Sequence, residues 1–289
     1  MPSRPWLGRL RFALMTPKMR NAKLRASVAG RRILLTGASA GIGRATALTL
    51  ADSEAKMILV ARDAEALAQV RDQIVAAGGE ATVFACDLSE RSARTELIER
   101  VKEECGDVQT LINNAGLSIR RPLDQSWDRA NDFERMLELN HRAAQDLILG
   151  FAPAMAQHGD GHIVNVSTIG AQTGAPNFAG YISSKAALDQ FSRSASLELS
   201  SLGVHFSTLY MGLVRTRMMA PTKIYDRFPA ASAETAAARI ACALVYRPIR
   251  MSTAIGYIIS VLDALSPRLV AWMFSVWHDR VHLWFARRG

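Results

Sequence analysis

Residues 34–50, LLTGASAGIGRATALTL, contain a short apolar run, a glycine-rich turn and the start of a helical pattern. The apolar run is typical of a buried strand, and the stretch after the turn is typical of a helix. Glycine lets the backbone approach a pyrophosphate closely, and the first turn of a helix has free N–H groups that bind anions. This strand–turn–helix setting predicts a dinucleotide site formed by Gly37, Ser39, Ala40, Gly41, Ile42 and Gly43.

Similar apolar runs recur along the chain, and helical patterns separate them. They are AKMILVAR (55–62), ATVFACDLS (81–89), VQTLINNAG (108–116), GHIVNVST (161–168) and VHFSTLYMG (204–212). Regular alternation of strands and helices implies a parallel sheet that is covered on both faces. We therefore expect the α/β class: a single domain with a doubly wound, Rossmann-type parallel sheet and a helical C-terminal extension.

The net charge of +9 is unevenly distributed. Residues 1–51 hold ten cations and no acid, whereas the rest of the chain, with 25 cations and 26 acids, is almost neutral. We expect a basic N-terminal arm over 1–27, a dinucleotide-binding and catalytic domain over 28–250, and an aromatic, basic helical extension over 251–289. Apolar side chains accompany the cations of the arm. Peripheral membrane contact through the basic termini and a solvated or packed leader therefore both stay open.

Composition and motifs exclude several classes of protein. Cys86, Cys105 and Cys242 are far apart and form neither a disulfide framework nor a zinc motif, which fits a reducing cytoplasm. No uncharged apolar run is long enough for a transmembrane helix, and the N-terminus lacks the apolar core of a signal peptide. No nucleic-acid recognition motif accompanies the positive charge. We expect a cytoplasmic protein, with association at a membrane surface as the open alternative.

The ends of the next strands indicate which dinucleotide binds. In this fold the end of the second strand faces the adenosine ribose, where an acid binds a 2′-hydroxyl and a guanidinium binds a 2′-phosphate. Arg62 stands at that end and favours NADP(H) over NAD(H). Asp87, after the third strand, is expected at the adenine edge. Small residues after the fourth strand let the cofactor lie against the backbone, at Asn114, Ala115 and Gly116.

Tyr181 and Lys185 lie four residues apart in GYISSKAALDQ, about one helical turn, so both project from one face of a helix. A phenol beside an ammonium is a proton donor whose pKa the positive charge pulls down. We therefore expect Lys185 to lower the pKa of Tyr181. Such a pair is suited to protonate an oxyanion while a hydride reaches a carbonyl carbon.

The ordered set of TGxxxGxG, NNAG and YxxxK resembles the short-chain dehydrogenase/reductase family over about residues 28–220. The resemblance implies a catalytic tetrad. In it, Asn140 holds a proton-relay water, and a hydroxyl after the fifth strand binds the substrate oxygen. Tyr181 is the acid/base, and Lys185 also binds the nicotinamide ribose. Both of these side chains then contact the cofactor.

The chain departs from the family pattern at two positions. Counting back from the tyrosine places Thr168 where the family has serine, and Ser167 precedes it as the alternative. A threonine hydroxyl still donates a hydrogen bond. Met211 stands where the family usually has proline. The resemblance implies that Thr216, further along this segment, still reaches the nicotinamide or the phosphate side of the cofactor, and that Val214 also contacts the cofactor.

A narrower resemblance concerns the segments over 113–140 and 210–229, which are similar to bacterial fatty acyl-CoA reductases of the short-chain type. It implies NADPH-dependent reduction of a long-chain acyl-CoA thioester to a fatty aldehyde. The broader family resemblance implies a homo-oligomer. Arg120, Arg121 and Lys223 flank the expected substrate entrance. They either meet the phosphates of coenzyme A or form a solvated rim.

Two other functions stay open. The same tetrad would serve an NADP(H)-dependent carbonyl reductase or alcohol dehydrogenase acting on a lipid-like substrate, and a cofactor-binding scaffold without turnover is the third reading. His278 and His282 are spaced by four residues but lack a third ligand, so we expect no metal site. Trp272, Trp277 and Trp284 suit either an interfacial belt or ordinary packing.

Overall fold

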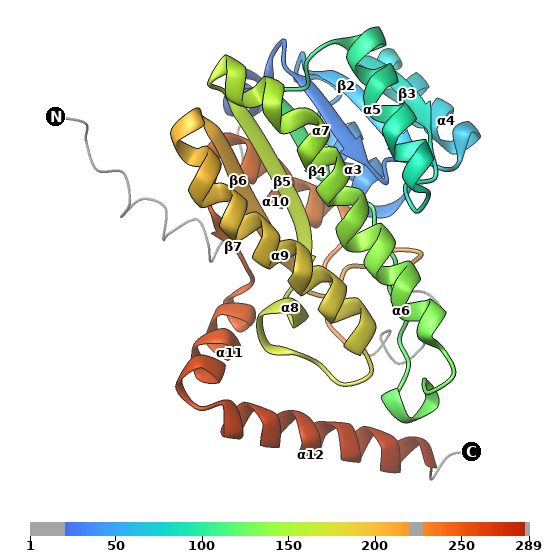
Figure 1. The fold of residues 1–289 in the computed structure, drawn as a ribbon, viewed down its shortest axis with the longest axis vertical. Coiled ribbons are helices and arrows are strands. Elements are labelled where there is room, and N and C mark those ends of the chain that lie inside the picture. The colour runs from blue at the N-terminus through green and yellow to red at the C-terminus, as the bar shows by residue number, and fades with distance from the viewer. Residues whose placement is uncertain (1–20, 220–227, 287–289) are drawn as a thin grey trace, which may run out of the picture.

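In the computed structural model, seven parallel strands form one sheet with helices on both faces (Figure 1). The structure describes residues 21–219 and 228–286, with side chains up to residue 276. The strands are β1 (Arg32–Thr36), β2 (Lys56–Ala61), β3 (Glu80–Ala85), β4 (Thr110–Asn113), β5 (Gly161–Thr168), β6 (Val204–Met211) and β7 (Arg250–Met251).

The helices that cover the sheet and extend it follow the strands along the chain. The α-helices are α2 (Asn21–Val28), α3 (Gly41–Thr49), α4 (Ala64–Ala76), α5 (Arg91–Cys105), α6 (Ala130–Leu137), α7 (Ala143–His158), α8 (Gly170–Thr173), α9 (Ala179–Leu199), α10 (Ala233–Tyr246), α11 (Ala254–Leu265) and α12 (Pro267–Ala286). The tighter or wider turns are η1 (Leu123–Gln125), the π-helical η2 (Glu138–Arg142) and η3 (Ser200–Leu202).

The six predicted strands are confirmed, and their spatial order is β3-β2-β1-β4-β5-β6-β7. The sequence does not predict β7, because a two-residue strand shows no periodicity. On β1, Leu35 pairs with Leu59 of β2 on one side and with Ile112 of β4 on the other. The chain order therefore reverses between β1 and β4, and the crevice at their carboxyl ends is where open α/β sheets bind ligands.

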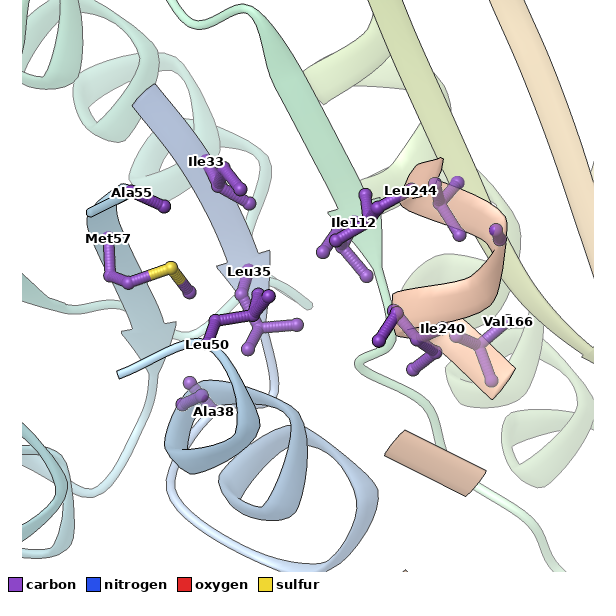
Figure 2. Packing of buried hydrophobic residues seen from close by; sticks show 14 of the residues in the cluster. Ile33, Leu35, Ala38, Leu50, Ala55, Met57, Ile112, Val166, Ile240 and Leu244 are labelled. Carbon is purple, nitrogen blue, oxygen red and sulfur yellow. The ribbon is translucent and has the colours of Figure 1, made fainter. Parts of the chain in front are cut away.

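Successive side chains of β1 enter two separate hydrophobic cores. Ile33 and Leu35 face the core under α3 and α10, where Ile240 packs on the sheet (Figure 2). Leu34 faces the opposite core, under α5 and α7, together with Leu147. Because both faces of the strand are buried, it is apolar throughout instead of alternating. This burial holds the strand ends in fixed positions around the crevice.

The helix at the start of the described chain packs onto the domain. In α2, Leu24 and Val28 are buried in the core that lies under α3 and α10. Residues 21–27 are basic, and the charge pattern assigns them to the arm, yet they form a helix on the sheet domain. Charge alone does not separate an arm from a surface helix that buries one apolar stripe.

The extension begins at α11, which Thr253 caps by accepting a hydrogen bond from Gly256 N–H at 3.0 Å. This helix packs against α8, and α12 packs against α11. Figure 1 shows α12 crossing beyond the carboxyl ends of β5 and β6, on the side of the crevice. Within the described residues, no helix combines the length and the hydropathy needed to cross a bilayer.

Candidate active site

Thr36 and Asn114 fasten the loops that follow β1 and β4 to each other. The Thr36 hydroxyl accepts hydrogen bonds from the backbone N–H groups of Asn114 and Ala115, both at 3.0 Å. The Asn114 amide donates to the Thr36 carbonyl at 2.9 Å. The glycine turn is therefore held in place over the crevice. Asn114 is predicted to contact the cofactor, but its side-chain amide is hydrogen-bonded to this turn.

The first turn of α3 follows the glycine turn at the carboxyl end of β1. No side chain caps it, so its backbone N–H groups are available to an anion. Gly41 has φ +54°, a conformation that favours glycine, and a Cβ on Gly43 would lie 2.1 Å from the carbonyl oxygen of Gly37. The methyl group of Thr216 lies 3.1 Å from where a Gly41 Cβ would be. Thr216 is thus brought onto the glycine turn, and its contact with the cofactor stays a prediction.

At the end of β2, the acid and the cation have different roles. Asp63 caps α4 by accepting a hydrogen bond from Ala66 N–H at 2.9 Å. The Arg62 side chain is 75% exposed, and its Nη1 lies 3.9 Å from Oδ2 of Asp87. Burial opposes ionisation of Asp87, but hydrogen bonds from Ser89 and the charge of Arg62 hold its pKa below the usual range. A cation therefore faces solvent where the adenosine ribose is expected.

Thr168, Tyr181 and Lys185 come together between the end of β5 and the first turns of α9. The Thr168 hydroxyl accepts from Gly170 N–H at 3.3 Å and is near enough to the Tyr181 phenol to favour its ionised form. The Lys185 side chain is buried, and its Nζ donates to the carbonyl oxygen of Val166 at 2.9 Å. A Cβ on Gly116 would lie 3.4 Å from that Nζ. The residues predicted from NNAG and from YxxxK are therefore neighbours.

Burial dominates the ionisation of this cluster. It raises the pKa of Tyr181 to about 12, and the hydrogen bond from Thr168 offsets only part of the rise. Burial also lowers the pKa of Lys185 to about 8. The net shift of the Tyr181 pKa is thus upward, opposite to the expected direction, and a lowering by Lys185 stays a prediction. Desolvation disfavours the charged phenolate, which explains the direction of this shift.

Asn140 is buried in the π-helical turn η2, and its amide connects two loops of the site. Its Oδ1 accepts from Leu117 N–H at 2.7 Å, and its Nδ2 donates to Leu117 O at 2.8 Å. Nδ2 also donates to the Ser184 hydroxyl at 2.9 Å, which in turn donates to the carbonyl of Tyr181 at 2.7 Å. The side chain thus positions the start of α9. Its role toward a relay water stays a prediction.

The alternative hydroxyl, Ser167, occupies a different environment from Thr168. Its Oγ is buried and has no hydrogen-bond partner in the described part of the chain. Neighbouring side chains of a strand point to opposite faces, so the hydroxyl next to Tyr181 is that of Thr168.

Met211 is buried, and its carbonyl accepts from Ile169 N–H at 2.9 Å. Val214 follows and forms an isolated bridge with Ala231.

A buried arginine that sequence reasoning missed supports the site. Arg94 of α5 donates to Glu138 at 2.7 Å, to Asp146 at 2.8 Å and to the carbonyl of Leu88 at 2.9 Å. Burial alone would raise the pKa of Glu138, but hydrogen bonds from arginines hold it below its usual range. Glu138 opens the π-helical turn that carries Asn140. In the charge-rich sequence of α5, nothing distinguishes this arginine from solvated neighbours.

The predicted contacts with coenzyme A have mixed outcomes. The Arg121 side chain forms an ion pair with Asp132, and its backbone N–H donates to Asn177 O at 2.9 Å, just before α9. Its guanidinium is therefore already engaged by a carboxylate. Arg120 is half-buried. Lys223 lies outside the described residues. So do the side chains of Trp277, Trp284, His278 and His282.

A family model of the short chain dehydrogenases matches residues 31–225. The chain belongs to this family of oxidoreductases, which confirms the membership predicted from TGxxxGxG, NNAG and YxxxK. The parallel sheet, with its ligand crevice between β1 and β4, is the expected doubly wound fold.

Individual relatives and a solved structure within this family are also similar to the chain. The chain is 42% identical to a fatty acyl-CoA reductase of Acinetobacter baylyi, over 90% of this chain and 88% of that protein. It is 46% identical to a fatty acyl-CoA reductase of Mycobacterium tuberculosis, over 83% of this chain and 82% of that protein. A metagenomic short-chain oxidoreductase crystallised with NADP has a TM-score of 0.66 and 33% identity, covering 76% of this chain and 92% of that chain.

Proposed function

We propose that this protein is an NADP(H)-dependent reductase that converts a long-chain fatty acyl-CoA thioester into a fatty aldehyde. One observation carries the reaction type: the Thr168 side chain interacts closely enough with the Tyr181 phenol to shift its pKa, and Lys185 lies one helical turn away on α9. Two hydroxyl donors side by side suit the oxygen of a carbonyl that receives a hydride. The 42% and 46% identities to fatty acyl-CoA reductases support a thioester as the substrate.

The residues present fit NADP(H). The Lys185 ammonium makes one hydrogen bond among the described residues, so two of its three donors remain for the hydroxyls of a ribose. The uncapped first turn of α3 suits the pyrophosphate. The exposed Arg62 guanidinium suits a 2′-phosphate, because Asp63 is already engaged as a helix cap. The NADP in the similar metagenomic oxidoreductase supports the same choice.

When bound, the cofactor supplies the hydride to the carbonyl carbon. Thr168 and Tyr181 donate hydrogen bonds to the carbonyl oxygen, and Tyr181 then transfers its proton to it. With a pKa of about 12 the phenol is protonated at neutral pH, so it is ready to act as the acid. Lys185 stabilises the phenolate that this transfer leaves. The resulting thiohemiacetal collapses by breaking its C–S bond, which releases the aldehyde and coenzyme A as the free thiol.

The decisive experiment incubates the purified protein with NADPH and palmitoyl-CoA and follows cofactor absorbance and free thiol together. Equal loss of NADPH and gain of thiol is the expected result. Parallel reactions contain a long-chain aldehyde or a ketone in place of the thioester. NADPH loss with these substrates and no thiol from acyl-CoA would reject thioester reduction and assign the site to a carbonyl reductase.

A further inference from the structure

The two helices of the extension present large apolar side chains to solvent. Each of them is between 43% and 78% exposed, and we call them the apolar stripe: Ile255, Ile258, Val261, Leu265, Leu269 and Trp272. They recur every three or four residues, which places those of each helix on one side of it. Contiguous exposed apolar surface is uncommon on soluble monomers and marks an interaction site. The apolar stripe is therefore a candidate binding surface.

The opposite side of α11 is fixed against the active-site loop. The Ser252 hydroxyl, fully buried, donates to Oε1 of Gln172 in α8 at 2.6 Å. A Cβ on Gly256 would lie 2.9 Å from the side chain of Ile169, the residue directly after Thr168. The inner side of α11 thus touches the residue that follows Thr168, the last residue of β5. Whatever binds the outer side is one helix away from that strand end.

The charge of the chain ends selects the occupant. Arg268 is exposed between Leu265 and Leu269. Over residues 266–289 the sequence has four arginines and one acid, and over 1–27 it has seven cations and no acid. Apolar side chains that insert at the headgroup boundary, with nearby cations, match an anionic lipid surface. A second copy of the chain matches less well, because it would bring two sets of cations together.

We propose that the apolar stripe docks the protein on an anionic lipid bilayer and holds the strand end that carries Thr168 near its surface. The link to substrate delivery rests on the proposed function, since a long acyl chain partitions into the same bilayer. Docking itself does not depend on the reaction. The stripe on α11 and α12 would enter the headgroup region, and the exposed Arg268 would contact phosphates above it.

The test is flotation of the full-length protein with vesicles of phosphatidylcholine containing phosphatidylglycerol. The wild type is expected to float with these vesicles and to bind pure phosphatidylcholine more weakly. The triple variant Ile258→Glu, Leu265→Glu, Trp272→Glu is expected to bind at least about tenfold more weakly, because three apolar insertions are lost. Val75→Glu, an exposed apolar position on α4, is the matched control and should bind as the wild type.

Several results would overturn docking by the stripe. Wild-type protein that stays below the vesicles excludes it, and a triple variant that still floats assigns membrane contact to the basic arm alone. A smaller particle mass for the triple variant in light scattering, without vesicles, assigns the stripe to a second copy. Circular dichroism checks folding, and if the triple variant is unfolded the single change Trp272→Glu, expected to weaken binding severalfold, decides instead.

Turnover of a short, water-soluble acyl-CoA separates this proposal from the proposed function. The triple variant is expected to lose vesicle binding but to keep wild-type turnover of this substrate, because its three changed residues lie outside the reacting cluster. That result would support docking by the stripe without affecting the proposed reaction. Intact vesicle binding with no thiol released from any acyl-CoA would reject the thioester reaction and leave docking in place.

Discussion

The crevice between β1 and β4 and the C-terminal helices α11 and α12 are organised in opposite ways. In the crevice, polar side chains are bound to protein partners: Asn114 holds the glycine turn, and Asn140 holds the loop at Leu117. On α11 and α12, large side chains such as Leu265 and Trp272 face solvent without cover from the described chain. The first region is arranged to hold atoms in place for chemistry. In the second region, the apolar side chains are removed from water only when another surface binds them.

The largest effect should come from the centre of the crevice. Tyr181→Phe removes the proton donor and the partner of Thr168, so turnover should fall at least about 10³-fold. NADPH binding, measured by fluorescence titration, should stay close to wild type because the ring is retained. Retained turnover would exclude Tyr181 as the acid.

A second pair of changes tells Thr168 from Ser167. Thr168→Ala removes a hydrogen-bond donor to the developing oxyanion and should lower kcat about 10²-fold. Ser167→Ala changes a buried hydroxyl without a partner in the described residues and should leave kcat within about twofold. Steady-state kinetics on both variants is the measurement. The opposite ranking would assign the substrate-binding role to Ser167.

Arg62→Ala should affect the cofactor alone. Loss of a charge-assisted pair with a 2′-phosphate should raise the KM for NADPH about 10- to 100-fold, while the KM for NADH stays unchanged. Comparing the two cofactors in one assay is the internal control. Equal losses with both cofactors would show that Arg62 does not read the 2′-phosphate.

Lys185→Met should stabilise the cofactor-free protein while abolishing turnover. Burial lowers the pKa of Lys185 to about 8, so holding it charged destabilises the fold below that pH. The gain should be about 1–3 kcal/mol at pH 7 and should shrink as pH rises from about 8 toward the unfolded pKa of about 10.4. Urea unfolding at pH 7 and pH 9 measures it. A gain that does not depend on pH would point to packing instead of charge.

The smallest effect should come from the extension. Leu265→Ser removes an apolar side chain that is already 78% exposed, so the free energy of unfolding should change by less than about 0.5 kcal/mol. The buried control Leu244→Ser, on α10 under the sheet, should lose about 3 kcal/mol. A large loss at Leu265, measured by urea unfolding, would show that the stripe is covered in solution.

Local sequence determined the sheet and the two ends of the reacting cluster. Glycines at 37, 41 and 43, and the four-residue spacing of Tyr181 and Lys185, act within one turn or one helix. Such patterns can be recognised from the sequence because they do not depend on contacts with distant residues. The same holds for six strands, whose apolar runs are long enough to be recognised. It does not hold for β7, which has two residues and depends on pairing with β6.

Only the tertiary structure decided how the cluster is held and charged. Arg94 of α5 pairs with Glu138 of η2, and Asn140 of η2 donates to Ser184 of α9, but nothing in the neighbouring residues shows that these distant segments meet. Burial sets the pKa of Tyr181 and Lys185, and burial depends on residues far away in the chain. The sequence by itself therefore determined which groups meet at the crevice. Their ionisation, and the outward direction of the apolar stripe, follow from the desolvation and packing that the whole fold imposes.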